Sequence, residues 1–291
     1  MPGLIKKEEF KDNCGFGLIA NINGIKSHKV IINSINALIS MTHRGGVGSD
    51  GKTGDGCGLL FDIDHKFFAD TILKEQNIEI GEHFAIGQIF YNQDIAKLLP
   101  KIKKILKSEN LALAAYRKVP VDEKILGEIA HSCLPEIFQL FIKPSEKDFN
   151  QEVFQTGLIQ ARKYIEEIYM DDEKLYVCSM SSKTVVYKGL MLPNAIKEFY
   201  LDLNQENFRA STCVFHQRFS TNTSPRWHLA QPFRLLAHNG EINAIRGNRN
   251  WVKARSSKFK TPLIPKIQKF KQLVNETGSD SSSLDNMIEL L

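Results

Sequence analysis

The chain reads Asn13-Cys14-Gly15-Phe16-Gly17-Leu18-Ile19-Ala20 near its start, so a cysteine stands directly before an apolar stretch that predicts a β-strand. Cleavage between Asn13 and Cys14 would give Cys14 both a thiol and a free α-amino group. Because an α-amine has a reference pKa of about 7.7–8.0, a usable fraction of it is neutral near pH 7 and can accept a proton. A nucleophile with its own base is the N-terminal form of cysteine catalysis. We therefore expect residues 1–13 to be a leader that is removed and Cys14 to be a nucleophile; a small buried cysteine is the alternative.

The composition is that of a globular protein with a sizeable core. Hydrophobic residues make up 42% of the 291 positions and charged residues 24%, and the net charge of +5 is too small to indicate nucleic-acid binding by itself. The leader has charges where a signal peptide needs apolar residues, and no apolar run is long enough to cross a membrane. Five cysteines lack metal-binding spacing, which favours a reducing compartment and argues against a zinc site: Cys14, Cys57, Cys133, Cys178 and Cys213. We expect a cytoplasmic protein, or a stromal one if a plastid encodes it.

Strands and helices interleave along the chain, which predicts a layered α+β domain. Strands are expected at residues 15–22, 59–63, 83–91, 111–119, 136–142, 175–180, 185–187, 212–218 and 233–238. Helical spacing of apolar residues occurs at 28–41, 65–76, 95–107, 149–170, 241–251 and 279–291. Residues 175–180 and 185–187 are expected to pair as a hairpin around Ser182-Lys183. The last helix reaches the end of the sequence with an unpartnered apolar face, so we expect the domain to be incomplete at its C-terminus.

A glycine-rich loop at residues 42–58 holds the best match to a known short motif. Gly46-Val47-Gly48-Ser49-Asp50-Gly51-Lys52-Thr53 fits the P-loop pattern, which cradles phosphate at the start of a helix. That pattern needs a preceding strand and a following helix, whereas here a predicted helix precedes it and Gly54-Asp55-Gly56-Cys57-Gly58 follows. We therefore expect a structural or substrate-lining loop rather than a nucleotide site.

A cysteine that attacks an amide needs an oxyanion hole, that is, hydrogen-bond donors where negative charge develops. Phe233-Arg234-Leu235-Leu236-Ala237-His238-Asn239-Gly240 supplies candidates, because Asn239 has a side-chain amide and Gly240 an accessible backbone N–H. An Asn-Gly pair also marks a type I′ hairpin turn. The helical spacing that follows the pair weakens the hairpin interpretation.

An amino-acid substrate also needs groups that bind its α-carboxylate and α-ammonium. Arg218 ends a predicted strand and can bind a carboxylate through two hydrogen bonds; a plain surface arginine is the alternative. Asp280 heads the last helix and can accept a hydrogen bond from an ammonium group, unless it or Ser279 is merely the helix N-cap. Arg44 in Thr42-His43-Arg44-Gly45-Gly46 closes the first helix, where a cation is favourable.

Together these segments resemble the N-terminal glutaminase domain of the glutamate synthase large subunit, a class II (N-terminal nucleophile) glutamine amidotransferase. The resemblance runs from Cys14 to Leu291. It rests on six motifs in family order: Cys14-Gly15-Phe16-Gly17, Thr42-His43-Arg44-Gly45-Gly46, Thr53-Gly54-Asp55-Gly56, His216-Gln217-Arg218-Phe219-Ser220-Thr221-Asn222-Thr223, His238-Asn239-Gly240-Glu241-Ile242-Asn243 and Gly278-Ser279-Asp280-Ser281. The stretch 216–251 favours glutamate synthase over the related phosphoribosyl-pyrophosphate, glucosamine-phosphate and asparagine-forming amidotransferases.

The resemblance implies a role for each matching residue. Cys14 would be the nucleophile exposed by removal of residues 1–13, and Asn239 and Gly240 would form the oxyanion hole. The residues that bind L-glutamine would be Arg218 at the α-carboxylate, Asp280 at the α-ammonium, and Arg44 and Thr221 beside them. For residues 14–291 the resemblance implies the four-layer αββα sandwich of the N-terminal nucleophile hydrolases, without a metal site.

The same resemblance implies a larger enzyme. Ammonia released from glutamine would pass to a downstream synthase domain of the same polypeptide, where 2-oxoglutarate is aminated and reduced at FMN with electrons relayed by an iron–sulfur cluster. The electron donor would be a small NADPH-oxidising subunit or ferredoxin. The scattered cysteines of this chain do not form the motif that such a cluster needs, so we expect no cofactor in this domain.

Two other interpretations stay open. One is a different N-terminal nucleophile amidohydrolase or amidotransferase, with another ammonia acceptor. The other is a nucleic-acid-binding domain whose binding would be steeply salt-dependent and would use six cations: Arg246, Arg249, Lys253, Arg255, Lys258 and Lys260. A solvated helix and loop explain those charges as well, so we expect neither a nucleic-acid nor a membrane partner.

Overall fold

Two antiparallel sheets form the centre of the protein in a computed structural model, which describes residues 15–146, 148–170, 174–218, 224–265 and 267–291. The first sheet has the strand order β1 (Phe16–Ala20), β8 (Thr212–Gln217), β2 (Cys57–Asp62) and β7 (Thr184–Gly189). The second has the order β4 (Leu111–Lys118), β5 (Glu136–Pro144), β3 (Ala85–Tyr91) and β6 (Leu175–Ser181). The predictions for Cys14 and Thr221 lie outside the described residues.

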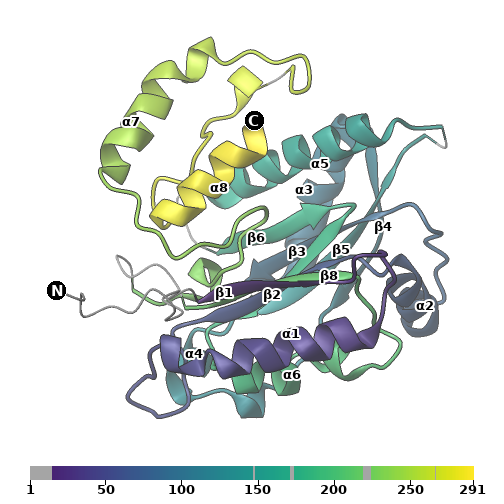
Figure 1. Ribbon diagram of the computed structural model, residues 1–291. Coiled ribbons are helices and arrows are strands. Elements are labelled where there is room, and N and C mark those ends of the chain that lie inside the picture. The colour runs from purple at the N-terminus through teal and green to yellow at the C-terminus, as the bar shows by residue number, and fades with distance from the viewer. Residues whose placement is uncertain (1–14, 147, 171–173, 219–223, 266) are drawn as a thin grey trace.

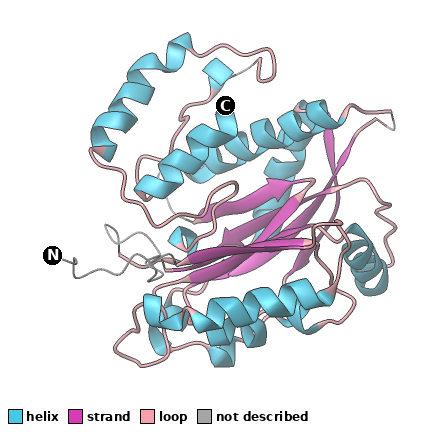
Figure 2. Ribbon diagram, in the orientation of Figure 1, coloured by secondary structure: helices cyan, strands magenta, loops and turns pink. Residues whose placement is uncertain are grey.

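Helices lie on two sides of the pair of sheets (Figure 1). On the first sheet, α1 (His28–Ser40) packs against β1 and β8; on the second, α3 (Ile95–Ser108) packs against β4 and α5 (Gln151–Glu166) against β6. The other α-helices are α2 (His65–Gln76), α4 (Glu128–Ser132), α6 (Ile196–Phe199), α7 (Ile245–Arg255) and α8 (Asp280–Leu290). Short 3-10 helices are η1 (Thr42–Arg44), η2 (Glu123–Ile125), η3 (Glu167–Tyr169), η4 (Pro193–Ala195), η5 (Leu201–Asn204), η6 (Trp227–Leu229), η7 (Ser256–Lys258) and η8 (Ile267–Lys269). Figure 2 shows the strands as one central block between the helices.

The long helices form where the apolar spacing predicts them. α3 buries Leu98, Ile102 and Leu106, which recur at intervals of four residues and so lie on one face. It begins at Asp94, whose side chain accepts a hydrogen bond from Ala96 N at 2.9 Å and thereby satisfies an amide that the helix leaves unpaired. Its face closes a core with α5 and the second sheet, while a larger core joins the two sheets with α1 and α2.

The predicted hairpin between residues 175–180 and 185–187 is wrong. β6 pairs with β3 in the second sheet, whereas β7 pairs with β2 in the first, so the turn between them carries the chain from one sheet to the other. The Ser181 hydroxyl holds this turn by accepting hydrogen bonds from the backbone N–H of Lys183 (3.0 Å) and Thr184 (3.3 Å). Nearly every residue of β7 is buried, which shows that the strand has packing on both faces. An apolar run of this kind cannot reveal which strand it pairs with.

Residues 233–238 form no strand, contrary to the prediction. Arg234 is buried and donates to the carbonyl oxygen of Val177 in β6 (2.9 Å). Leu235 N donates to Asp285 Oδ1 of α8 (2.8 Å), and Phe233 N donates to the carbonyl oxygen of Leu236 (2.9 Å) in a tight turn. The backbone donors that a strand ladder would use are therefore engaged by the turn and by α8.

The two predicted C-terminal helices differ in how well their starts were placed. The helix expected at 241–251 begins later, at Ile245, because Ala244 adopts a left-handed conformation with a φ of 53°. α8 lies where it was predicted, and Ser279 is its N-cap: the Ser279 side chain accepts a hydrogen bond from Ser282 N at 3.1 Å. Asp280 is therefore the first helical residue rather than the cap.

Candidate active site

Gly15 lies where β1 meets β8 and Asn239. Phe16 is opposite His216 in the sheet, and Gln217 N donates to the carbonyl oxygen of Gly15 (2.6 Å). A methyl group built on Gly15 would lie 2.7 Å from the carbonyl oxygen of Gln217 and 3.3 Å from Asn239 Nδ2. No side chain fits there, so only glycine allows this approach. The residue that follows Cys14 in the chain thus touches the predicted oxyanion donor.

Arg218 has a strained backbone. Its φ is 95°, and its N–H donates to the carbonyl oxygen of Gly56 (2.7 Å), which itself has a φ of 115°. A positive φ in a residue other than glycine costs on the order of 1–3 kcal/mol and persists only where the surrounding structure enforces it. Because such strain concentrates at binding and active sites, it favours a functional role for Arg218 over the surface-arginine alternative.

Asp55 is a partner of Arg218 that we did not identify from the sequence. Its Oδ2 lies 3.7 Å from Arg218 Nε. Burial raises the pKa of Asp55, and a backbone hydrogen bond and the charge of Arg218 oppose that rise. The sequence feature that could have identified Asp55 is its position between two glycines in the motif Thr53-Gly54-Asp55-Gly56. The structure thus places Asp55 beside the predicted carboxylate-binding arginine.

The glycine-rich loop brings Arg44 to the same region. Arg44 ends η1 and is half-buried, and Gly45 follows it. A methyl group on Gly45 would collide with the side-chain amide of Gln217 and would lie 2.9 Å from Asp55 Oδ1. The segments that carry Arg44, Asp55 and Arg218 therefore meet around Gly45 and Gln217.

The glycine-rich loop at residues 42–58 lacks the following helix that a phosphate-binding loop needs, in agreement with the prediction of a structural or substrate-lining loop. The chain runs from the Lys52-Thr53 pair into β2, and no helix begins between them in this described stretch. The Asp50 carboxylate accepts hydrogen bonds from the Thr53 hydroxyl (2.6 Å), Thr53 N (2.8 Å) and Ile129 N (3.0 Å), and these bonds hold the pKa of Asp50 well below its usual range. An ionised carboxylate inside the loop opposes phosphate binding.

Several buried polar atoms at this junction have no hydrogen-bond partner among the described residues. Gln217 is completely buried, and neither its Nε2 nor its Oε1 is paired there. Asp55 Oδ1 is in the same situation. Because buried polar groups are rarely left unpaired, these atoms indicate polar partners beyond the described residues.

Buried side chains clamp the peptide that precedes Asn239. Gln231 Oε1 accepts from His238 N (3.1 Å), and Gln231 Nε2 donates to the carbonyl oxygen of His238 (3.1 Å). His216 Nε2 donates to the same carbonyl oxygen (3.1 Å). Burial lowers the pKa of His216 to about 4, so its ring is neutral at pH 7 and carries its proton on Nε2. The clamp fixes the position from which Asn239 and Gly240 extend.

The amide of Gly240 is already occupied in this conformation. Gly240 N donates to His238 Nδ1 at 2.9 Å. An oxyanion bound at this amide would take the place of the imidazole. Of the two predicted oxyanion donors, Asn239 is therefore the one that already lies against Gly15, and Gly240 is the one that must exchange its partner.

Asp280 connects α8 to the segment that follows Gly240. Its Oδ2 accepts from Ile242 N (2.7 Å), and its Oδ1 accepts from Ser281 N (2.7 Å). The side chain is buried, with 5% of its surface exposed. The Ser281 hydroxyl also donates to Oδ1 (3.3 Å), so the carboxylate is held in a buried polar setting at the start of α8.

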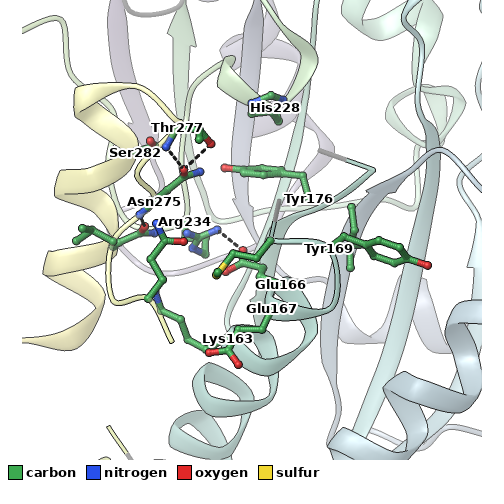
Figure 3. Close-up of a pocket in the computed structure, with 15 residues that line it drawn as sticks. Lys163, Glu166, Glu167, Tyr169, Tyr176, His228, Arg234, Asn275, Thr277 and Ser282 are labelled. Atoms are coloured by element: carbon green, nitrogen blue, oxygen red, sulfur yellow. Dashed lines mark hydrogen bonds and ion pairs between the residues drawn. The ribbon is translucent and has the colours of Figure 1, made fainter. Parts of the chain in front are cut away.

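A cavity of about 100 Å³ lies behind the turn that leads into α8 (Figure 3). Asn275, Thr277 and Ser282 line it on the side of α8. Tyr176 and His228 face it from the other side, and their rings pack at 5.2 Å.

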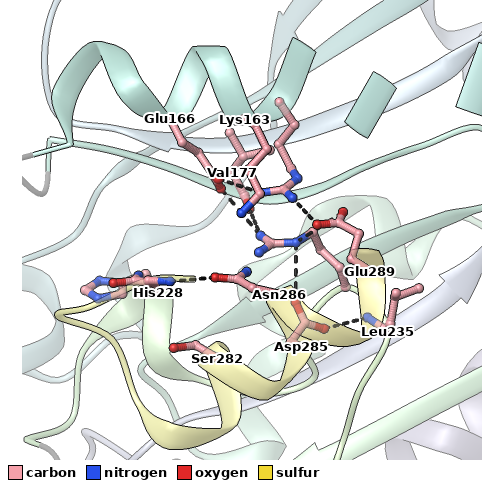
Figure 4. Close-up of polar contacts among 12 residues, drawn as sticks. Lys163, Glu166, Val177, His228, Leu235, Ser282, Asp285, Asn286 and Glu289 are labelled. Carbon is pink, nitrogen blue, oxygen red and sulfur yellow. Dashed lines mark hydrogen bonds and ion pairs between the residues drawn. The ribbon is translucent and has the colours of Figure 1, made fainter. Parts of the chain in front are cut away.

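A buried ionic cluster holds α8 against α5 (Figure 4). Arg162 of α5 pairs with Glu166 (2.5 Å) and with Glu289 of α8. Arg234 lies between the helices, 3.4 Å from Asp285 and 3.5 Å from Glu166. Burial alone would raise the pKa of Glu289, but the charges of Arg162 and Arg234 lower it. Because α8 begins with Asp280, this cluster also sets where that carboxylate lies.

The buried cysteines are poor nucleophiles. Cys57, Cys178 and Cys213 are buried, which raises the pKa of Cys178 and Cys213 to about 12 and that of Cys57 still further. Thiols with such values hold almost no thiolate at neutral pH. Cys133 directly follows α4 and is exposed. The buried thiols therefore offer no competing nucleophile at the junction around Gly15.

The described residues contain no group of three or more histidine, cysteine, aspartate or glutamate side chains arranged to hold a metal ion. In the same part of the chain, no helix combines the length and the apolar character needed to span a membrane.

Known glutamate synthases align with almost the whole chain. The glutamate synthase [NADH] of Saccharomyces cerevisiae is 39% identical over 99% of this chain, and the ferredoxin-dependent glutamate synthase 1 of Arabidopsis thaliana is 39% identical over 96% of it. The large chain of the Bacillus subtilis glutamate synthase [NADPH] is 37% identical over 99% of it. The chain spans 14%, 18% and 19% of the length of these three relatives, respectively.

A family model extends over the same residues. The model of the class-II glutamine amidotransferases matches residues 14–291, so it begins at Cys14. The match includes every predicted site residue and the structural junction around Gly15. The chain therefore belongs to the class II glutamine amidotransferases and is homologous to the glutaminase region of glutamate synthase large chains.

Proposed function

We propose that this domain hydrolyses the side-chain amide of L-glutamine, with Cys14 as an N-terminal nucleophile after removal of residues 1–13. The observation that carries the proposal is the contact between Gly15 and Asn239, which brings an amide donor next to the residue that follows Cys14. Membership of the class II amidotransferases supports the same reaction. The paired sheets with helices on two sides support the four-layer αββα sandwich of the N-terminal nucleophile hydrolases for residues 14–291.

The reaction proceeds in two halves. The neutral α-amine of Cys14 takes the thiol proton, directly or through water, and the sulfur attacks the side-chain carbonyl carbon of glutamine. The oxygen becomes negative and accepts hydrogen bonds from the Asn239 side chain and from Gly240 N–H, which leaves His238 Nδ1. The C–N bond of the glutamine side chain then breaks, and the protonated α-amine of Cys14 gives its proton to the departing ammonia. Water hydrolyses the γ-glutamyl thioester, which releases glutamate and restores the thiol.

Four residues bind the substrate in this proposal. Arg218, held by Asp55, binds the α-carboxylate, because a guanidinium can donate two parallel hydrogen bonds to a carboxylate. Asp280, a buried carboxylate fixed by Ile242 N and Ser281 N, accepts from the α-ammonium. Arg44 and Thr221 complete the binding region.

The reaction of the larger protein is a further proposal, since this chain corresponds to less than a fifth of each relative's length. Ammonia passes to a synthase domain of the same polypeptide, which converts 2-oxoglutarate to glutamate with FMN and an iron–sulfur cluster. The described residues of this chain do not fit such a cluster, because no suitable group of ligands exists among them. The names of the relatives suggest NADH, NADPH or ferredoxin as the electron source. The cytoplasm or a plastid stroma would house the enzyme.

Intact-mass analysis of active protein, combined with an ammonia-release assay, tests the proposal. The mass should correspond to a chain that begins at Cys14, and glutamine should yield equal amounts of ammonia and glutamate. Cys14→Ser should abolish release while the melting temperature stays the same. An active enzyme that keeps residues 1–13 would refute the α-amine as the base, and inactivity of the processed protein would refute the glutaminase function.

A further inference from the structure

The guanidinium of Arg249, in α7, donates several hydrogen bonds to the turn that leads into α8. Its Nη1 donates to the carbonyl oxygen of Glu276 (2.8 Å), and its Nη2 donates to those of Gly278 (2.6 Å) and Ser279 (3.1 Å). Its Nε donates to the Ser283 hydroxyl (2.9 Å). One guanidinium thus binds four acceptors on both sides of Asp280.

Core packing explains little of this arrangement, because Val252 is the one described α7 residue in a hydrophobic cluster and it is only partly buried. No residue of α7 is buried, and Figure 1 shows the helix far from the two sheets. One other cation of α7, Lys253, reaches the same turn, where it pairs with the Glu276 side chain at 3.5 Å while both groups stay largely exposed. An exposed pair of this kind contributes little. The four hydrogen bonds of Arg249 are therefore the main polar attachment of α7 to the turn among the described residues.

The turn and the segment after Gly240 are joined at two points. Ile242 N donates to Asp280 Oδ2 (2.7 Å), and Arg249, seven residues later, binds the backbone that carries Asp280. Burial lowers the pKa of Arg249, whereas the charges of Asp280 and Glu276 raise it. The guanidinium of Arg249 and the Asp280 carboxylate therefore attract one another electrostatically. One end of the 242–249 segment thus binds the Asp280 carboxylate, and the other end binds the backbone directly before Asp280.

We propose that Arg249 is a positioning residue that sets the Asp280 carboxylate for the α-ammonium of the substrate. The inference rests on the proposed function of Asp280. Lysine cannot replace arginine in this role, because one ammonium group cannot reach acceptors spread from Glu276 to Ser283 in a planar fork. Loss of Arg249 leaves the charge of Asp280 intact but lets the backbone around it move.

Steady-state kinetics of the full chain with Arg249→Lys test the proposal. We expect the KM for glutamine to rise about tenfold and kcat to change less than about twofold, since the variant weakens binding and leaves the nucleophile and oxyanion donors in place. Ser283→Ala, which removes one of the four bonds, should raise KM by about twofold. Lys253→Met, one turn along the same helix, should behave as wild type. A wild-type KM in Arg249→Lys would overturn the proposal.

Hydrogen exchange separates this inference from the function on which it rests. Backbone amides at 278–282 should exchange at least about tenfold faster in Arg249→Lys than in Lys253→Met. If Arg249→Lys exchanges faster but the wild-type protein has no glutaminase activity, the proposed function is refuted and the role of Arg249 in fixing the turn is retained. If the wild-type enzyme is active and Arg249→Lys changes neither the exchange rates nor KM, the positioning role of Arg249 is refuted. Faster exchange in Arg249→Lys with an unchanged KM would show that Arg249 is only a structural residue.

Discussion

Replacing Arg234 by methionine should destabilise the domain more than almost any other single change. Arg234 has 8% of its surface exposed and lies 3.4 Å from Asp285 and 3.7 Å from Glu289, which are 0% and 8% exposed. It also donates to the carbonyl oxygen of Val177. Methionine fills a similar volume but leaves the buried Asp285 carboxylate without its main cationic partner, while Glu289 keeps Arg162.

The expected loss follows from that burial. Removing one partner of a buried ion pair costs about 3–5 kcal/mol, because the remaining charge stays desolvated. A chain of 291 residues has an unfolding entropy of roughly 0.6 kcal/mol/K near the melting temperature, from about 2.1 cal/mol/K per residue. The melting temperature of Arg234→Met should therefore fall by roughly 5–8 °C.

Differential scanning calorimetry at pH 7 measures this shift, and Lys66→Met is the matched control. Lys66 forms an exposed pair with Asp70 at 3.2 Å, so its loss should cost less than about 1 kcal/mol. The difference between Arg234→Met and wild type should shrink as the pH falls towards about 4, where the buried acids of the variant become protonated. A shift no larger than that of Lys66→Met would refute the assignment of Arg234 as the centre of the cluster.

Four further predictions concern the site. Asn239→Ala should lower kcat for glutamine by about 10²–10³-fold with little change in KM, and a kcat near wild type would exclude Asn239 as an oxyanion donor. Arg218→Lys should mainly raise KM, because lysine lacks the two-pronged geometry; unchanged binding would remove Arg218 as the carboxylate anchor. A diazo-ketone analogue of glutamine should label Cys14 and none of the buried cysteines, whose raised pKa values leave them as thiols, and peptide mapping would reveal any other target. Burial holds the pKa of His216 at about 4, below its ordinary 6.5, so the unfolded chain takes up the proton first as the pH falls. The free energy of unfolding should therefore fall by up to about 1.4 kcal/mol for each pH unit between 6.5 and 4 on account of this residue. Denaturant titrations of His216→Gln should show a shallower pH dependence, and an identical slope would contradict the neutral buried ring.

Local patterns predicted the helices well but not every strand. α3 and α5 follow from apolar spacing, because a helix buries one face whatever it packs against. The same kind of reasoning failed at residues 233–238, where Arg234 and Leu235 are bound by α8, about fifty positions later. It also paired β6 with β7, although both are edge strands of different sheets. Strand partners depend on contacts between distant segments, which a window of a few residues does not contain.

The candidate site divides in the same way. The sequence alone determined the chemical groups: a cysteine that can become N-terminal, an Asn-Gly pair, an arginine and an aspartate that suit an amino acid, and the family to which these motifs belong. Only the tertiary structure decided that Asn239 lies against Gly15, that Asp55 holds Arg218, and that Ser279 rather than Asp280 caps α8. The physical reason is that side-chain chemistry belongs to single residues, whereas distance, burial and strain arise when β1, β8 and the start of α8 are packed together.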